Sequence, residues 1–312
     1  MAEATEIERE ATTRGMPTRG PTAPSRTLNA MTVDVEDYFQ VEAFAKVVSR
    51  DRWETMPRRV EENTDRLLAL FADHGVKATF FVLGWIATRH RPLIQRIVAG
   101  GHELASHGFS HLRADRQSRE EFRSDVRDTR RLLEDVGGVP VIGYRAATFS
   151  IGRGNWWAYD VLSEEGYDYS SSVFPIVHDL YGVPDAPREP FRPTGAPILE
   201  IPLTTVRLFG RNLPCSGGGY FRLLPYGISR RGFARVIERE RRPCIFYCHP
   251  WEIDPAQPRQ TAAPLKSRLR HYLNLGKMER RIARLLRDFA WGRMDEAFLG
   301  TSGKADGARR IG

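Results

Sequence analysis

Cysteine is scarce in this sequence, which has three, Cys215, Cys244 and Cys248, among its 312 residues. They form no Cys-x-x-Cys pair and their number is odd, so the sequence does not predict a disulfide scaffold. Two of them lie in one apolar run, residues 244–248, where buried free thiols are the simplest interpretation.

Long apolar runs are also lacking. The longest stretches, such as residues 79–87, are far shorter than the ~20 residues that a membrane-spanning helix needs. The amino terminus has neither a basic start nor an apolar stretch, so it does not predict a secretory signal. We therefore expect no membrane-spanning segment and a cytoplasmic location.

The sequence lacks long runs of charge of a single sign, although the chain is basic overall. There are 47 Lys and Arg against 39 Asp and Glu, a net charge of +8. Many arginines alternate with acidic residues, as in residues 119–123, which is typical of a solvated surface. No nucleic-acid recognition motif accompanies the charge, so we expect no nucleic-acid partner.

The chain divides into a leader, a folded region and a tail. Residues 1–27 and 296–312 are predicted to be disordered, because they contain few large apolar side chains. Between them, short apolar runs that predict strands alternate with helical patterns. The predicted strands cover residues 28–35, 78–83, 102–106, 141–148, 167–173, 198–203 and 244–248, and the clearest helices residues 61–73, 91–100 and 119–136.

This alternation predicts an α/β fold with parallel strands. Seven units close better as a distorted (β/α)7-type barrel than as an open sheet. Residues 183–295 are predicted to add a C-terminal elaboration, which begins with a stretch rich in Pro and Gly. Within it, residues 265–294 are basic and amphipathic, and we expect them to allow peripheral contact with an anionic membrane surface.

Polar side chains at the ends of apolar runs are the candidates for chemistry, because such barrels carry their sites at the carboxyl ends of the strands. Asp34, Glu36 and Asp37 follow the first strand, and three crowded carboxylates repel one another unless a cation or a proton intervenes. An acidic loop or a helix N-cap is the structural alternative.

Two histidines follow the third predicted strand. His107 and His111 are four residues apart, which on a helical turn would let both imidazoles reach one metal. Taken alone, the pair is equally compatible with core histidines. Arg145, which could hold a carboxylate ionised, and His249 each end a further apolar run. The constellation as a whole predicts a metal-assisted hydrolase.

The chain resembles the polysaccharide deacetylases of the NodB-homology type, carbohydrate esterase family four, in particular the branch associated with exosortase and exopolysaccharide genes of Gram-negative bacteria. The resemblance covers about residues 28–290. Its most specific motifs are at residues 32–39 (TVDVEDYF), 101–107 (GHELASH), 216–226 (SGGGYFRLLPY) and 249–254 (HPWEID).

The resemblance implies roles for individual residues. Asp34 matches the general base, Arg145 the arginine that orients it and His249 the general acid. His107 and His111 match the histidine ligands of a divalent metal, most often Zn²⁺, with Co²⁺, Ni²⁺ or Mn²⁺ as alternatives. The family motif has a ligand directly after the base, but Val35 stands there, so the third ligand is Glu36 or Asp37.

The implied activity is removal of N-acetyl groups from the amino sugars of a bacterial exopolysaccharide or its precursor. Tyr220, Phe221 and Trp251 are predicted to contact the sugar, although the Gly217–Gly219 segment before them could simply be a tight turn and Trp251 could belong to the core. Two other functions remain open. One is hydrolysis of a small cyclic amide on the same fold, and the other is carbohydrate binding without catalysis.

Overall fold

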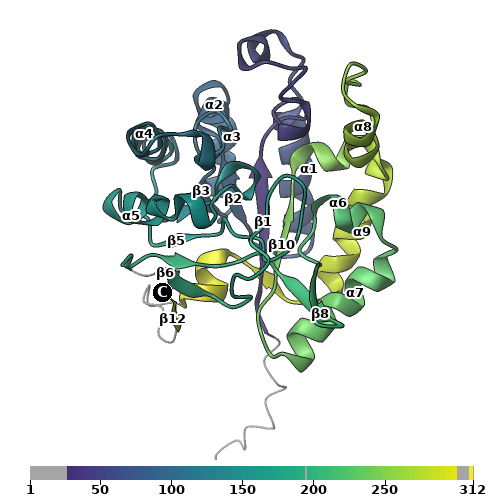
Figure 1. Ribbon diagram of the computed structural model, residues 1–312. Coiled ribbons are helices and arrows are strands. Elements are labelled where there is room, and N and C mark those ends of the chain that lie inside the picture. The colour runs from purple at the N-terminus through teal and green to yellow at the C-terminus, as the bar shows by residue number, and fades with distance from the viewer. Residues whose placement is uncertain (1–26, 194, 301–308, 312) are drawn as a thin grey trace, which may run out of the picture.

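The structure, a computed structural model, describes residues 27–193, 195–300 and 309–311. Nearly all its strands belong to one curled sheet flanked by helices (Figure 1). The strand order is β10-β1-β2-β3-β4-β5-β7-β6-β12, with β11 paired to β1. All pairs in this sheet are parallel except β6 with β7.

The strands of this sheet are short. They are β1 (Asn29–Val35), β2 (Thr79–Val82), β3 (Glu103–Ser106), β4 (Gly143–Tyr144), β5 (Tyr169–Ser170), β6 (Phe191–Pro193), β7 (Leu199–Glu200), β10 (Ile245–Cys248), β11 (Trp291–Gly292) and β12 (Arg309–Ile311). A separate antiparallel hairpin joins β8 (Thr205–Leu208) to β9 (Arg211–Pro214). Every residue of β1 is buried, as expected for a parallel strand covered on both faces.

The helices follow the strands along the chain. They are α1 (Val60–Asp73), α2 (Gly84–Arg89), α3 (Arg91–Ala99), α4 (Arg119–Gly137), α5 (Trp157–Glu164), α6 (Gly218–Leu223), α7 (Tyr226–Ala234), α8 (Leu265–Tyr272) and α9 (Leu275–Asp288). The boundaries of α4 are encoded locally, since Ser118 and Glu121 form a capping box and Gly138 ends the helix at φ 66°.

The predicted α/β class and the seven predicted strands are confirmed, and the distorted barrel is a half-barrel. No ladder joins β7 to β10 among the described residues. The segment 201–217 lies between them instead, where the Ile245 amide donates to Thr204 Oγ1 (2.6 Å) and the Tyr247 amide to the Ser216 carbonyl (2.7 Å).

Two expectations for the C-terminal part need correction. The predicted disordered tail begins too early, because Asp295–Leu299 form a short helix, η8, in which Leu299 is buried. The amphipathic stretch 265–294 is not one exposed surface, because the apolar side of α9 packs into the core. The predicted leader lies, except for Thr27, outside the described residues, as do residues 301–308 and 312.

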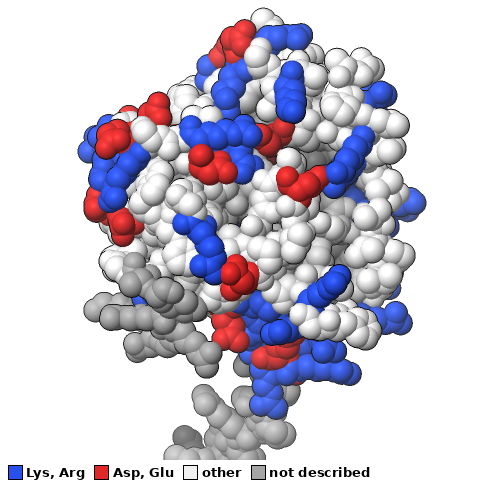
Figure 2. Space-filling view, viewed as in Figure 1, with Lys and Arg blue, Asp and Glu red and all other residues white. Residues whose placement is uncertain are grey.

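The surface charge is mixed. On the face shown in Figure 2, basic and acidic side chains alternate, and basic ones gather most densely at the lower end. In the described part of the chain, no helix has the length and apolar character needed to cross a membrane.

Candidate metal centre and active site

The predicted site residues lie at the carboxyl ends of neighbouring strands. Asp34 is the penultimate residue of β1, and Glu36 directly follows that strand. His107 and Arg145 follow β3 and β4 directly, and His249 follows β10. Because β10, β1, β2, β3 and β4 are consecutive in the sheet, these five side chains converge on one edge.

Glu36, His107 and His111 form a cluster that could hold a metal ion. One ligand atom from each lies within 4.8 Å of the others, and all three side chains are buried. Glu36 Oε2 is 3.0 Å from His111 Nε2, and the two imidazole ring centroids are 5.4 Å apart. A carboxylate with two imidazoles is a common ligand set of catalytic zinc sites.

The hydrogen bonds around this cluster fit a cation. His107 Nδ1 lies 2.8 Å from the Arg145 carbonyl, which fixes the tautomer and leaves Nε2 for a ligand. Glu36 Oε2 is buried and accepts no hydrogen bond in the described residues. Burial lowers the pKa of His107 and of His111, which favours the neutral imidazoles that bind metals. Burial raises the pKa of Glu36 to about 7 against the opposing charge of His249.

The structure brings Glu36, and not Asp37, to the two histidines. The Asp37 carboxylate points to the start of α1, where Oδ2 accepts from the amides of Arg59 (2.7 Å) and Val60 (3.0 Å). Its Oδ1 accepts from the Tyr38 amide (2.9 Å). Asp37 therefore satisfies free amides at a helix N-terminus, the structural alternative for this acidic cluster.

The two histidines do not lie on a helical turn, as their spacing suggested. Residues 107–111 form a loop in which Gly108 has φ 72° and His111 has φ 53°. The carbonyls of Gly108 and Phe109 accept from the amides of Gly84 and Trp85 at the start of α2. These bonds fold the loop back, so that the imidazoles meet without helical geometry.

Arg145 and Asp34 form a fully buried ion pair. Arg145 Nη1 donates to Asp34 Oδ1 (2.6 Å) and to Thr32 Oγ1 (2.9 Å), while its Nε donates to the Ser171 carbonyl (3.2 Å). The guanidinium also lies over the Phe81 ring, 4.0 Å from its centroid. Asp34 is thus held from the Oδ1 side, and its Oδ2 faces His249 Nε2 at 3.9 Å.

His249 is oriented by Glu252, a residue whose role the sequence analysis missed. Glu252 Oε2 lies 3.3 Å from His249 Nδ1 and accepts from the His249 amide (3.1 Å). Arg222 Nε donates to the other carboxylate oxygen of Glu252 (2.8 Å), and both side chains are buried. Burial alone lowers the pKa of His249, but the Glu252 hydrogen bond and the nearby carboxylates raise it to about 9. The three-residue spacing in HPWE, typical of a capping box, was the available signal.

A cavity of about 610 Å³ opens over this cluster, and only two of the three residues predicted to contact the sugar line it. Tyr220 and Trp251 line it, whereas Phe221 is buried against Phe246 and Tyr226 in the core. The prediction for Phe221 is therefore wrong. Trp251 also supports the site, because its Nε1 donates to Glu36 Oε1 (3.3 Å).

The glycine segment before Tyr220 caps and begins α6 and lies close against β10. Gly217 has φ 132°, and a Cβ there would lie 2.1 Å from the Tyr247 carbonyl oxygen. Gly218 has φ 55° and lies against the Tyr247 ring. The glycines thus allow residues 217–218 to approach β10 closely, which places Tyr220 at the cavity.

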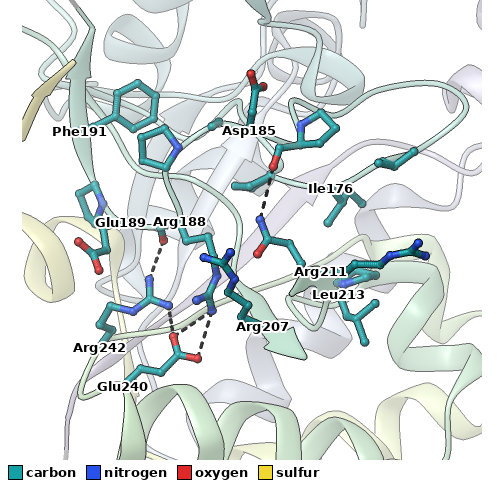
Figure 3. Close-up of a pocket in the computed structure, with 18 of the residues that line it drawn as sticks. Ile176, Asp185, Arg188, Glu189, Phe191, Arg207, Arg211, Leu213, Glu240 and Arg242 are labelled. Carbon is teal, nitrogen blue, oxygen red and sulfur yellow. Dashed lines mark hydrogen bonds and ion pairs between the residues drawn. The ribbon is translucent and has the colours of Figure 1, made fainter. Parts of the chain in front are cut away.

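A larger cavity of about 1550 Å³ lies elsewhere, beside β6 and the β8–β9 hairpin (Figure 3). None of the predicted site residues lines it. Figure 3 shows Arg188 and Arg242 turned toward Glu240, with which both form ion pairs. We interpret these ion pairs as structural. The candidate catalytic residues line the smaller cavity.

Fold and site together define a class: an α/β half-barrel with a Glu–His–His cluster and an Asp–Arg pair at the carboxyl ends of its strands. Residues 52–168 match the model of the polysaccharide deacetylase family. A second model, a domain of unknown function (DUF3473), matches residues 171–299.

Relatives of known name match parts of the chain. It is 30% identical to a chitooligosaccharide deacetylase of Sinorhizobium fredii over 46% of this chain and 61% of the relative. It is 33% identical to one of Rhizobium leguminosarum bv. trifolii (32% and 44%) and 32% identical to a peptidoglycan-N-acetylglucosamine deacetylase of Bacillus cereus (25% and 28%). The chain thus spans less than two thirds of each relative's length.

One solved structure supports the fold over nearly its whole length. A candidate polysaccharide deacetylase of Mycobacterium smegmatis superposes with a TM-score of 0.57, covering 91% of this chain and 92% of the other. The sequence identity is 19%, so this similarity bears on the fold alone.

Proposed function

We propose that this protein is a metal-dependent hydrolase that removes N-acetyl groups from amino sugars. The observation that carries the proposal is the Glu36–His107–His111 cluster, with the buried Asp34–Arg145 pair on one side and His249 within 3.4 Å of Glu36. A binding protein needs none of these groups together. The deacetylase names of the relatives support N-acetylated oligosaccharides as the substrate class.

In this proposal Glu36, His107 and His111 hold a divalent ion, which we take to be Zn²⁺. When bound, the ion supplies a Lewis acid for the acetyl carbonyl and for the attacking water. Asp34 accepts a proton from that water at Oδ2, since Arg145 occupies Oδ1.

His249 is the proton donor on the other side of the reaction. As water adds to the acetyl carbon and the carbon–nitrogen bond breaks, His249 Nε2 gives its proton to the departing nitrogen. The products are acetate and a free amine. Glu252 holds the Nδ1 side of the ring, and the raised pKa of His249 keeps the ring protonated at neutral pH.

The exopolysaccharide assignment rests on the sequence motifs. We propose a bacterial exopolysaccharide, or a precursor of one, as the acetylated polymer, as in the exosortase-associated branch that the motifs resemble.

Acetate release from N-acetylglucosamine oligomers, measured with and without a chelator, tests the proposal. We expect release that a chelator abolishes and added Zn²⁺ or Co²⁺ restores. Release that a chelator leaves unchanged would contradict the role of the metal. Binding of the oligomers without any acetate would favour the non-catalytic alternative, and release from a cyclic amide alone would favour the small-substrate one.

A further inference from the structure

Exposed apolar side chains gather around the mouth of the catalytic cavity. Large apolar residues that are at least 36% exposed include five leucines, Leu180, Leu223, Leu265, Leu269 and Leu273, which we call the leucine rim. Four of the five line the cavity, and Leu265 lies one helical turn before Leu269 on α8. Isolated exposed leucines need no explanation, but a group of them at the mouth of a site marks a binding surface.

The core of this rim is one face of α8. Leu265 and Leu269 lie one turn apart on α8, and Leu273 directly follows the helix after a further interval of four residues, so the three leucines continue one stripe. Leu265 is 66% and Leu269 61% exposed, whereas His271 is buried and stacks on Trp251 with ring centroids 4.0 Å apart. The helix is thus anchored by one face and presents its leucines on another.

The backbone at the end of α8 is fixed as well. Arg222 Nη1 donates to the carbonyls of His271 and Leu273, both at 2.8 Å, and His271 Nε2 lies 2.6 Å from Gln257 Oε1. Because both the backbone carbonyls and the His271 side chain at the end of α8 form hydrogen bonds, the exposed leucines belong to a helix that is fixed in place.

The charge around the rim is positive. No Asp or Glu occurs between Asp254 and Glu279, a stretch with five basic residues, Arg259, Lys266, Arg268, Arg270 and Lys277. Lys266 and Arg270 share the single carboxylate of Asp179, and Arg268 has no ion-pair partner in the described part of the chain. Leucines flanked by basic side chains are typical of helices that lie on anionic membrane surfaces.

We propose that the leucine rim docks on the surface of an anionic lipid bilayer and turns the cavity toward an amino sugar carried on a membrane-anchored lipid. The sugar part of this inference rests on the proposed function, whereas the docking part does not. Leucines offer a sugar no hydrogen bonds and no ring platform, but they fit an acyl boundary, and the arginines fit lipid phosphates.

Thr27 and Met294 lie at the end of the sheet opposite α8. Thr27 precedes β1, and the Met294 amide donates to Thr79 at the start of β2, so both lie at the amino ends of the strands. The α8 helix lies at the other end of the sheet, at the upper right of Figure 1. These described segments do not line the cavity that the rim surrounds.

Sedimentation of the full chain with lipid vesicles tests the docking. We expect binding to phosphatidylcholine vesicles that contain a third of phosphatidylglycerol, and much weaker binding to pure phosphatidylcholine or at high salt. Leu265→Ser should weaken binding about tenfold, because a leucine loses its apolar burial. Arg268→Gln should weaken binding to the anionic vesicles only.

Ile228→Ser is the matched control, since Ile228 is 50% exposed on α7 and does not line the catalytic cavity. It should bind as the wild type does, and the melting temperatures should show that all variants fold. Equal binding by Leu265→Ser and wild type, or no preference for anionic vesicles, would overturn the proposal. So would a wild-type dimer that Leu265→Ser dissociates, because the rim would then cover a second copy. Vesicle binding does not depend on acetate release, so the two proposals fail separately.

Discussion

At the scale of single residues, the two oxygens of Asp34 have different surroundings. Oδ1 is bonded by Arg145 at 2.6 Å, and Oδ2 faces the cavity side near His249 at 3.9 Å. The carboxylate thus has one structural oxygen and one that can take a proton. Its proposed role as base can be tested separately from that of the Glu36 cluster, because Asp34 is not among the residues grouped as a possible metal site.

Asp34→Asn should lower acetate release by about 10²- to 10⁴-fold, the usual contribution of a general base. The bound metal, measured by elemental analysis, should stay at the wild-type level because the Glu36 cluster is unchanged. Near-normal turnover in this variant would remove Asp34 from the proposed mechanism.

Glu36 and Asp37 allow a paired test of the third metal ligand. Glu36 lies beside the two histidines, whereas the adjacent Asp37 is bonded to the start of α1. Glu36→Gln should fold normally but lose most of its metal, because the cluster loses its anionic ligand. Asp37→Asn should keep its metal and lose about 1 kcal/mol of unfolding free energy, as expected for a weakened helix cap. The reverse result, with metal lost only from Asp37→Asn, would contradict the proposed ligand set.

At the scale of elements, the wall between β7 and β10 depends on a close backbone contact just before α6 and not on a strand pair. Gly217 makes an isolated bridge to Tyr247, and the Ser216 carbonyl accepts from the Tyr247 amide. This contact positions both the end of β10, which precedes His249, and α6, which carries Tyr220 and Arg222.

Gly217→Ala should destabilise the fold by more than about 2 kcal/mol, because the new Cβ would meet the Tyr247 carbonyl and φ is 132°. Gly219→Ala, two residues later, is the control, since its Cβ would meet only an arginine nitrogen at 4.0 Å. Urea unfolding of both variants measures the difference. Equal stabilities would show that the contact with β10 tolerates a side chain.

Elements and strand-end residues could be predicted from the sequence, whereas contacts between distant segments could not. Apolar runs identified β1, β3 and β10, and the polar residues that follow them identified the site. The two-residue spacing of Asp34 and Glu36 did not reveal that the next residue, Asp37, turns toward α1. Glu252 escaped notice because its partner Arg222 lies 30 positions away in sequence, and Phe221 was misplaced because only packing distinguishes it from Tyr220.

At the scale of the whole molecule, the amino ends of the strands hold a buried carboxylate that makes stability depend on pH. Glu103 accepts from Tyr169 Oη (2.8 Å), from Thr79 Oγ1 and from the Asp295 amide (3.2 Å). Burial, and after it the charge of Asp295, raise the pKa of Glu103 to about 7. A raised carboxyl pKa means that the folded state favours the protonated form.

The stability from Glu103 should be fully present below its unfolded pKa, about 4.5, and lost as pH rises through about 7. Asp295→Asn should reduce this loss, because it removes a neighbouring negative charge. Its salt bridge to Arg293 is partly exposed and contributes little. Unfolding free energies at pH 5 and pH 8 test this, and an equal pH dependence in the variant would contradict it.

The half-barrel divides its site among separate stretches of chain. Asp34 and Glu36 precede the segment that matches the deacetylase model, His107, His111 and Arg145 lie within it, and His249 lies in the DUF3473 segment. Parallel pairing of β1 with both β2 and β10 joins these contributions. A fragment cut at residue 168 would therefore keep His107 and His111 but lose His249, both β10 and β11 beside β1, and the leucine-rimmed wall. In the proposed function, the histidine ligands and the walls that select the substrate are thus encoded in different segments, so mutation can alter what enters the cavity while leaving His107 and His111 untouched.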